Sequence, residues 1–299
     1  MKDSKKLNIG LTGASGFLGS AILEHFKNNG DNVIILDSLV HPNTKGPEAL
    51  IPDTLNWVLH FGATKSIEAS FKNPVNIYRR NMHSTMAALD IAMSRKSRFL
   101  YMSSYVYGKP NYLPIDEKHR TFVLNPYMGS KLLGEQISQY FHQYMGIAVI
   151  ILRGFTFYGP RQRGDQLIPS IIESIRNHKP ILVKDPNPKR DYLFISDFLR
   201  LLDIIVHSDY SGFEIYNIGG GVPYKNIEVA QMANSLAGNP VPIHIEGKER
   251  RNDVGECYAD TQKVSRYFQW LPEVDLSSGL NNCLSLFNLK QSHPKICVA

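Results

Sequence analysis

Near its N-terminus the chain reads Ile9-Gly-Leu-Thr-Gly-Ala-Ser-Gly-Phe-Leu-Gly19, with glycines at positions 13, 16 and 19. The segment begins as a short apolar strand and leads into an apolar-periodic helical stretch, 20–27. In a dinucleotide-binding turn the first glycine permits a tight turn, the second lets the backbone approach a pyrophosphate, and the third lets helix and strand pack closely. A flexible surface loop is the alternative, but it would not require this order. The stretch predicts a phosphate-binding turn at a helix N-terminus.

An acidic residue follows at the distance that such a turn requires. Asp37 ends the second expected strand, 33–37, roughly 20 residues after the glycines, where a carboxylate can accept hydrogen bonds from a ribose diol. The same carboxylate would repel a 2′-phosphate, so it favours NAD over NADP. Alone, Asp37 could be an ordinary strand-end residue; together with the glycine turn it indicates a ribose contact.

Apolar strands alternate with helical stretches over the first half of the chain. This alternation predicts crossover connections, and hence an α/β fold with a Rossmann-type, doubly wound parallel sheet. Residues 1–157 are expected to form the NAD-binding domain and residues 158–299 mainly a smaller C-terminal substrate lobe. The expected strands are 7–11, 32–36, 57–61, 99–102 and 147–152, and the expected helices are 20–27, 74–93, 127–144, 168–177 and 227–236.

Composition narrows the class of protein. The 299 residues are 43% hydrophobic and 20% charged, with a net charge of +6, which is ordinary for a globular protein. No run of Lys and Arg marks a nucleic-acid surface, so the charge favours a phosphate-bearing small molecule. No apolar run reaches the ~20 residues of a membrane span. The basic segment 1–6 leads straight into the glycine turn, so a cytoplasmic location is expected. The three scattered cysteines predict neither disulfides nor a metal site.

A second motif carries redox chemistry. Tyr127-Met-Gly-Ser-Lys131 places a phenol and an ammonium four residues apart, on one helical face. A tyrosine of pKa ~10 is a poor base at neutral pH, and a fixed cation nearby is expected to lower that value. Ser103 and Ser104 follow the strand 99–102, and ligands of open parallel sheets bind at such strand ends. A hydroxyl there can bridge Tyr127 and a substrate oxygen. A solvated Tyr–Lys pair is the alternative, but the position favours a catalytic centre of Ser103, Tyr127 and Lys131.

Together these motifs resemble the NAD-dependent epimerase/dehydratase family, extended short-chain dehydrogenase/reductases whose best-known members are UDP-glucose 4-epimerase and dTDP-glucose 4,6-dehydratase. In that family, tightly held NAD oxidises a sugar nucleotide to a keto intermediate. The resemblance runs from about residue 7 to residue 280. Its motifs are Thr12-Gly13-x-x-Gly16-x-x-Gly19, Asp37, His60-Phe-Gly-Ala63, Ser103-Ser-Tyr-Val-Tyr-Gly108, Tyr127-x-x-x-Lys131, Arg153-x-Phe155, Tyr158-Gly-Pro160 and Arg190-Asp-Tyr192.

The resemblance implies roles for individual residues. Tyr127 would be the general base, Lys131 its partner and ligand of the nicotinamide ribose, and Ser103 the hydroxyl that orients the sugar oxygen. Arg190 and Arg250 would hold the substrate diphosphate, a task suited to the guanidinium, and Arg251 could replace Arg250. The implied cofactor-binding residues are Gly13, Ser15, Gly16, Phe17, Leu18, Gly19, Asp37, Phe61, Gly62, Ala63, Thr64, Asn81, Tyr127, Lys131 and Phe155. The implied substrate-binding residues are Lys65, Ser104, Tyr105, Thr156, Gln166, Arg190 and Arg250.

Departures from the family pattern bear on the reaction. Ser104-Tyr105 stands where the dehydratases carry an Asp-Glu pair, so the proton carriers of that elimination are missing. Thr156 replaces the family's Asn. We therefore expect an NAD-dependent epimerase acting at C4 through a transient keto sugar. A ketoreductase, another dehydratase or a non-catalytic nucleotide-binding homologue are the alternatives. The donor is open among UDP-, dTDP-, GDP- and CDP-sugars.

The segment after Asp37 is unusually short. Residues 38–56 leave little room for the helix and third strand that the family usually fits before Trp57, so one sheet edge and part of the adenine site should be uncovered. The stretches 74–93 and 127–144 resemble the two helices that pair across the family's symmetric dimer interface, which implies a homodimer. The alternative is that both helices only cover the sheet of one chain.

Overall fold

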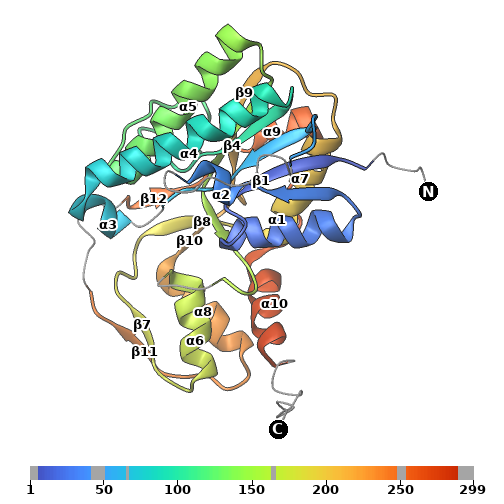
Figure 1. Cartoon of the computed structure of the whole chain (residues 1–299). Helices are drawn as coiled ribbons and strands as arrows, with labels where there is room; N and C mark the ends of the chain where they lie inside the picture. Colours follow the sequence, from blue (N-terminus) through green and yellow to red (C-terminus); the bar gives the residue numbers. More distant parts are fainter. Residues whose placement is uncertain (1–5, 42–50, 65–66, 163–165, 248–253, 289–299) are drawn as a thin grey trace.

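The fold is organised around a six-stranded, wholly parallel sheet (Figure 1). The protein is represented by a computed structural model that describes residues 6–41, 51–64, 67–162, 166–247 and 254–288. In spatial order the strands are β2 (Asn32–Ile35), β1 (Asn8–Thr12), β3 (Trp57–His60), β4 (Arg98–Met102), β5 (Val149–Gly154) and β9 (Phe213–Ile218). Strand β1 lies inside the sheet, with β2 on one side and β3, β4 and β5 on the other. The order in which strands are added therefore reverses at β1, as in a doubly wound sheet. The predicted Rossmann-type fold is confirmed.

Alternate residues of the central strands enter two different cores, because successive side chains of a strand point to opposite faces. On β4, Leu100 packs with Ile22 and Phe198, from α1 (Phe17–Asn28) and α7 (Ile195–His207), in one cluster. The neighbouring Tyr101 packs in a second cluster with Leu89 of α4 (Pro74–Ser94), bordered by side chains of α5 (Pro126–Met145). Figure 1 shows α4 and α5 along one face and α1 and α7 along the other. The sheet is therefore buried on both faces, as its uninterrupted apolar strands predict.

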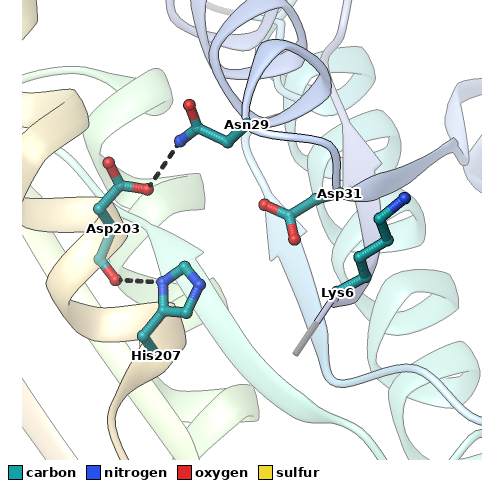
Figure 2. Close-up of a pocket in the computed structure, with 5 residues that line it drawn as sticks. All are labelled: Lys6, Asn29, Asp31, Asp203 and His207. Atoms are coloured by element: carbon teal, nitrogen blue, oxygen red, sulfur yellow. Dashed lines mark hydrogen bonds between the residues drawn. The ribbon is translucent and has the colours of Figure 1, made fainter. Parts of the chain in front are cut away.

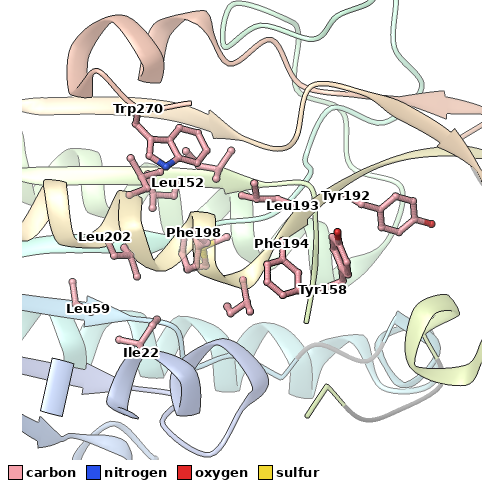
Figure 3. Close-up of a cluster of buried hydrophobic side chains, with 14 of the residues drawn as sticks. Ile22, Leu59, Leu152, Tyr158, Tyr192, Leu193, Phe194, Phe198, Leu202 and Trp270 are labelled. Atoms are coloured by element: carbon pink, nitrogen blue, oxygen red, sulfur yellow. The ribbon is translucent and has the colours of Figure 1, made fainter. Parts of the chain in front are cut away.

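The larger core continues into a second lobe. Figure 3 shows it running from Ile22 and Leu59, past Phe198, to Tyr158 and Tyr192. That lobe has two small sheets, one with β6 (Thr156–Tyr158), β8 (Lys189–Phe194), β10 (Pro223–Lys225) and β12 (Glu256–Cys257), the other with β7 (Ile181–Val183) and β11 (Ile243–Ile245). Its helices are α6 (Leu167–Arg176), α8 (Asn226–Leu236) and α10 (Leu276–Asn288).

The chain crosses between the lobes more than once. Strand β9 pairs with β5, and α7 and α9 (Gln262–Phe268) pack on the same body, although all three lie beyond residue 157. A single cut at 157/158 therefore does not separate the lobes. Long-range strand pairing places β9 in the main sheet. The sequence could not predict this placement, because the apolar strand β9 looks no different in sequence from the strands of the second lobe. Within the described residues no helix has the length and apolar character needed to cross a membrane.

Strand β2 is the outermost strand on its side of the described sheet. It ends at Ile35, and Asp37 begins a short helix, α2 (Asp37–Val40), rather than ending the strand. Ile35 is 47% exposed. Of the short segment 38–56, residues 42–50 lie outside the described residues, so the predicted uncovered edge stays a prediction. Ile51 and Leu55 are buried in the core on the α4 face of the sheet.

Gly19 offers a test of the predicted close packing between helix and strand. A Cβ at Gly19 would lie 1.9 Å from the Gly13 carbonyl oxygen. This oxygen belongs to the backbone, so it cannot move away as the end of a flexible side chain could. Although alanine favours a helix over glycine by ~1 kcal/mol, we expect Gly19→Ala to lower the free energy of unfolding by about 1–3 kcal/mol through overpacking. Urea denaturation measures this. The control is Gly255→Ala, whose Cβ would meet nothing within 4 Å. Equal stability of the two variants would contradict the packing argument.

Candidate active site

The glycine turn presents backbone donors at the carboxyl end of β1. Gly13 has φ +79°, a left-handed conformation that favours glycine, and a Cβ there would lie 2.7 Å from the Gly62 nitrogen. Gly16 is the N-cap of α1, and no side chain caps this helix. Ser15 and Gly16 are exposed, and Phe17 and Leu18 are half-buried. The first-turn amides of α1 are thus left for an external acceptor such as a pyrophosphate, so the turn fits NAD.

Asp37 contacts this turn directly. Its carboxylate accepts hydrogen bonds from the backbone N–H of Gly13 and, at 3.0 Å, of Ala14. The predicted ribose contact is therefore accompanied by a structural bond that sequence reasoning missed. A carboxylate has about four acceptor positions, so two amide bonds leave capacity for ribose hydroxyls.

Polar side chains connect the end of β3 to the catalytic helix. The Gly62 N–H donates to Thr12 Oγ1 at 3.0 Å, and the Thr64 N–H donates to Asn81 Oδ1 at 2.8 Å. Asn81 Nδ2 in turn donates to Ser130 Oγ on α5 at 2.8 Å. The structure thus brings together Gly62, Thr64 and Asn81, three of the predicted cofactor residues. Phe61 and Ala63 are half-buried between them, and Lys65 lies outside the described residues.

Helix α5 carries Tyr127 and Lys131. Asn125 caps the helix by accepting the Met128 N–H at 2.9 Å, and proline occupies the first helical position. Tyr127 is half-buried, whereas Lys131 is 3% exposed. The Lys131 ammonium lies over the ring of Tyr101, 4.2 Å from its centroid.

The electrostatics of the pair differ from the prediction. Burial raises the pKa of Tyr127, and a hydrogen bond with Ser104 partly opposes this rise. Burial lowers the pKa of Lys131 to about 7, with the charge of Glu135 acting in the opposite direction. The pKa of Tyr127 is therefore raised overall and not lowered as predicted, and the bond that favours the phenolate comes from Ser104. The Lys131 ammonium lies over the Tyr101 ring.

The two adjacent serines face different partners. Ser103 is 4% exposed, and its hydroxyl donates to Glu135 Oε1 at 2.5 Å. Ser104 is half-buried and is the hydroxyl that bonds Tyr127. Of the two predicted hydroxyls, the one that contacts Tyr127 in this structure is therefore Ser104. A buried carboxylate is stabilised by hydrogen-bond donors, and the Ser103 hydroxyl is one of the donors to Glu135.

Glu135 was missed at the sequence level, although it lies one helical turn beyond Lys131. Arg153 Nε donates to both carboxylate oxygens of Glu135, at 3.0 and 3.1 Å, and a terminal nitrogen donates to Oε2 at 2.6 Å. Arg153 also donates to the Tyr107 hydroxyl at 3.0 Å, which donates to Asn217 Oδ1 at 2.5 Å. This network joins α5, β5, the loop after β4 and β9. Each charge is bonded on several sides, as burial demands.

Tyr105 connects the serines to the predicted diphosphate clamp. Its hydroxyl donates to the Gly108 carbonyl, and its ring packs edge-on against Phe155, 5.4 Å between centroids. Burial raises the pKa of Tyr105, while the nearby charge of Arg190 on β8 lowers it. Arg190 donates to the Val254 carbonyl at 2.6 Å. The structure thus places Arg190 beside the Ser104–Tyr105 segment. Arg250 and Arg251 lie outside the described residues.

The two remaining substrate-binding predictions lie in the second lobe. Thr156 is half-buried at the start of β6 and pairs with Tyr192 of β8, next to the strand that carries Arg190. Gln166 is exposed at the N-cap of α6, where its side-chain oxygen accepts from Gln162 at 2.7 Å. Thr156 therefore adjoins the clamp strand, while Gln166 contacts a neighbour in its own loop.

A polar hollow of about 410 Å³ lies elsewhere on the protein (Figure 2). In its lining, Asp31 immediately precedes β2 and Lys6 stands two residues before β1 begins. The hollow therefore opens at the amino ends of these strands, whereas the glycine turn, Ser104 and Tyr127 lie at the carboxyl ends. It takes no part in the site. Across the described ranges, no three His, Cys, Asp or Glu side chains gather in a way that could hold a metal ion.

Comparisons with known proteins agree with this geometry. The model of the NAD-dependent epimerase/dehydratase family matches residues 9–219. A Methanocaldococcus jannaschii protein, provisionally named UDP-glucose 4-epimerase, is 31% identical over 92% of this chain and 96% of its own length. UDP-glucose 4-epimerase of Drosophila melanogaster is 28% identical over 88% of this chain and 91% of that protein. The structure of Bifidobacterium longum UDP-glucose 4-epimerase with NAD+ and UDP is 26% identical, with a TM-score of 0.82, covering 95% of this chain and 99% of that one. The chain therefore belongs to the NAD-dependent epimerase/dehydratase family.

Proposed function

We propose that this protein is an NAD-dependent nucleotide-sugar epimerase that inverts C4 of the sugar. The observation that carries the proposal is the placement of Tyr127, bonded to Ser104 and one turn from Lys131, at the same carboxyl edge of the sheet as the uncapped glycine turn. The D. melanogaster and B. longum relatives are named UDP-glucose 4-epimerases, which supports the reaction class. When bound along the turn, NAD supplies a reversible hydride acceptor.

The reaction needs one proton carrier. Tyr127, as phenolate, accepts the proton of the sugar 4-hydroxyl as C4 loses a hydride, which leaves a ketone. Once the keto sugar presents its other face, bound NAD would supply the hydride back to C4, while Tyr127 returns the proton to the oxygen. Ser104 stabilises the phenolate by donating a hydrogen bond, and the Lys131 ammonium keeps a positive charge at the site.

Dehydration is less well supported by the side chains present. Elimination requires an acid and a base near C5 and C6, and Ser104-Tyr105 provides no carboxylate there. Tyr105 is a poor substitute, because burial raises its pKa and its hydroxyl is bonded to the Gly108 carbonyl. A non-catalytic nucleotide-binding role is disfavoured, because folding alone does not require a buried lysine beside a tyrosine and a serine.

Arg190 is proposed to bind the substrate diphosphate, with Arg250 or Arg251 as its counterpart. Its position beside Tyr105 supports this role, because a sugar held at Tyr127 would extend its diphosphate toward the second lobe. The nucleotide base is left open among UDP-, dTDP-, GDP- and CDP-sugars. We also infer a cytoplasmic homodimer. Cys257 and Cys283 are both buried and are not joined by a disulfide within the described residues, which suits a reducing compartment.

The outward side of α4 and α5 supports the dimer. These two helices pack on each other and expose large apolar side chains that a symmetric four-helix contact would cover. They are Met86 and Met93 on α4 and Leu133, Tyr140 and Tyr144 on α5.

The reaction is tested by incubating the purified protein with NAD and a panel of UDP-, dTDP-, GDP- and CDP-sugars. We expect an isomer of equal mass without net NADH. Tyr127→Phe should lower kcat about 10²–10⁴-fold, because the proton carrier is lost while the ring still packs. The matched control is Tyr140→Phe, an exposed tyrosine of the same helix that is expected to leave kcat unchanged. Loss of a water mass from the sugar, or full activity of Tyr127→Phe, would refute the proposal.

The serines are separated by a pH profile. Because the Ser104 bond lowers the Tyr127 pKa, Ser104→Ala should raise that pKa and move the limb of the kcat–pH profile that reports Tyr127 to higher pH. Ser103→Ala should leave the limb in place and lower the free energy of unfolding by about 1–2 kcal/mol, since Glu135 loses a donor. The reverse pattern, with only Ser103→Ala moving the limb, would return the catalytic role to Ser103.

The dimer is tested by light scattering after size exclusion. Met86→Glu combined with Leu133→Glu should halve the measured mass, because two charges would be buried in each half of the contact. Leu182→Glu, at an exposed apolar position of β7, serves as the control and should leave the mass unchanged. A wild-type mass equal to that of one chain would overturn the inference.

A further inference from the structure

We infer that Tyr101 is a positioning residue for Lys131, holding its ammonium with the ring and its backbone with the hydroxyl; this rests on the proposed function. Tyr101 lies on β4 and is fully buried. The Lys131 Nζ is 4.2 Å from its ring centroid, within range of a cation–π interaction. The Tyr101 hydroxyl donates to the Lys131 carbonyl oxygen at 3.3 Å. One side chain therefore contacts both ends of the same lysine.

The ring matters because the ammonium has little other compensation for burial. In the described part of the chain no carboxylate forms an ion pair with Lys131. Glu135, the nearest acid along the helix, is already bonded by Arg153 and by Ser103. A buried charge without a partner is costly. The electron-rich face of Tyr101 is the group placed to offset that cost.

The Tyr101 ring is itself held in place. It stacks on His60, with centroids 5.7 Å apart and an interplanar angle of 26°. The hydroxyl faces Thr85, whose Oγ1 lies 3.2 Å from His60 Nε2. Helix α5 makes room for the hydroxyl at Gly134, where a Cβ would lie 2.1 Å from it. Contacts from β3, α4 and α5 thus leave the ring one position.

The groups facing Lys131 favour this assignment. Burial and the Lys131 charge lower the pKa of His60 well below its ordinary value, so His60 is neutral and does not compete as a cation. Burial, Glu135 and Tyr127 raise the pKa of Tyr101, which remains a neutral phenol at working pH. Burial lowers the pKa of Lys131 to about 7, against the effect of Glu135. Removal of the ring should lower it further, since a cation–π contact stabilises only the protonated form.

The test compares Tyr101→Phe, which keeps the ring, with Tyr101→Leu, which removes it. In the ligand-free protein, NMR titration of ¹⁵N-labelled lysine, with the Lys131 signal assigned through Lys131→Met, reports its pKa directly. We expect Tyr101→Phe to titrate within about 0.3 pH units of wild type and Tyr101→Leu about one unit lower, the size of a lost partly buried contact.

Each outcome has a meaning. Equal Lys131 titration in the Phe and Leu variants overturns the inference, whatever the activity. If no sugar nucleotide reacts, the proposed function fails while the NMR titration still decides the role of Tyr101. Thermal unfolding confirms that the variants are folded, and where Tyr101→Leu does not fold, Tyr101→Met removes the ring with an unbranched, flexible side chain that adapts better to the space. A purely structural role would lower the unfolding temperature of both variants without moving the titration.

Discussion

The buried ion pair between Glu135 and Arg153 fixes the catalytic helix against the sheet. Glu135 lies on α5, one turn beyond Lys131, and Arg153 lies on β5, with at least three hydrogen bonds between them. Neither charge could be buried alone at tolerable cost, so the pair imposes one rotation and one height on α5. That placement sets where Tyr127 and Lys131 stand, and it draws the Ser103 hydroxyl inward. Ser104, the next residue, is then the one that meets the tyrosine.

The parallel sheet brings the other parts of the site together at one edge. The carboxyl ends of β1, β3 and β4 lie along one edge, so the glycine turn, the Gly62–Thr64 segment and the serines become neighbours. Asn81 connects the Gly62–Thr64 segment to helix α5, because it is hydrogen-bonded to both Thr64 and Ser130. Arg190, from the other lobe, approaches the same edge beside Tyr105. The candidate site thus joins the proposed cofactor-binding edge of the sheet to the proposed diphosphate-binding Arg190, which separate strands carry.

The departures from the family pattern have physical consequences of different kinds. Ser104-Tyr105 removes the carboxylates of an elimination, which favours a reaction needing a single proton carrier. The short segment after Asp37 leaves β2 as the outer strand of the described sheet. Asp37 compensates locally, because its carboxylate bonds the turn amides and keeps the end of β2 and the glycine turn together.

Sequence alone determined the features that depend on short-range pattern. The glycine spacing after an apolar strand predicted the turn, strand–helix alternation predicted the sheet, and the four-residue spacing predicted that Tyr127 and Lys131 share a face. Tertiary structure decided which partners those groups meet. Glu135 reaches Ser103 across 32 residues, Tyr101 lies under a lysine 30 residues away, and β9 joins a sheet begun at residue 8. Such contacts leave no periodic trace in the chain. The pKa values of Tyr127 and Lys131 depend on that burial, because desolvation is a property of the packed interior and not of local spacing.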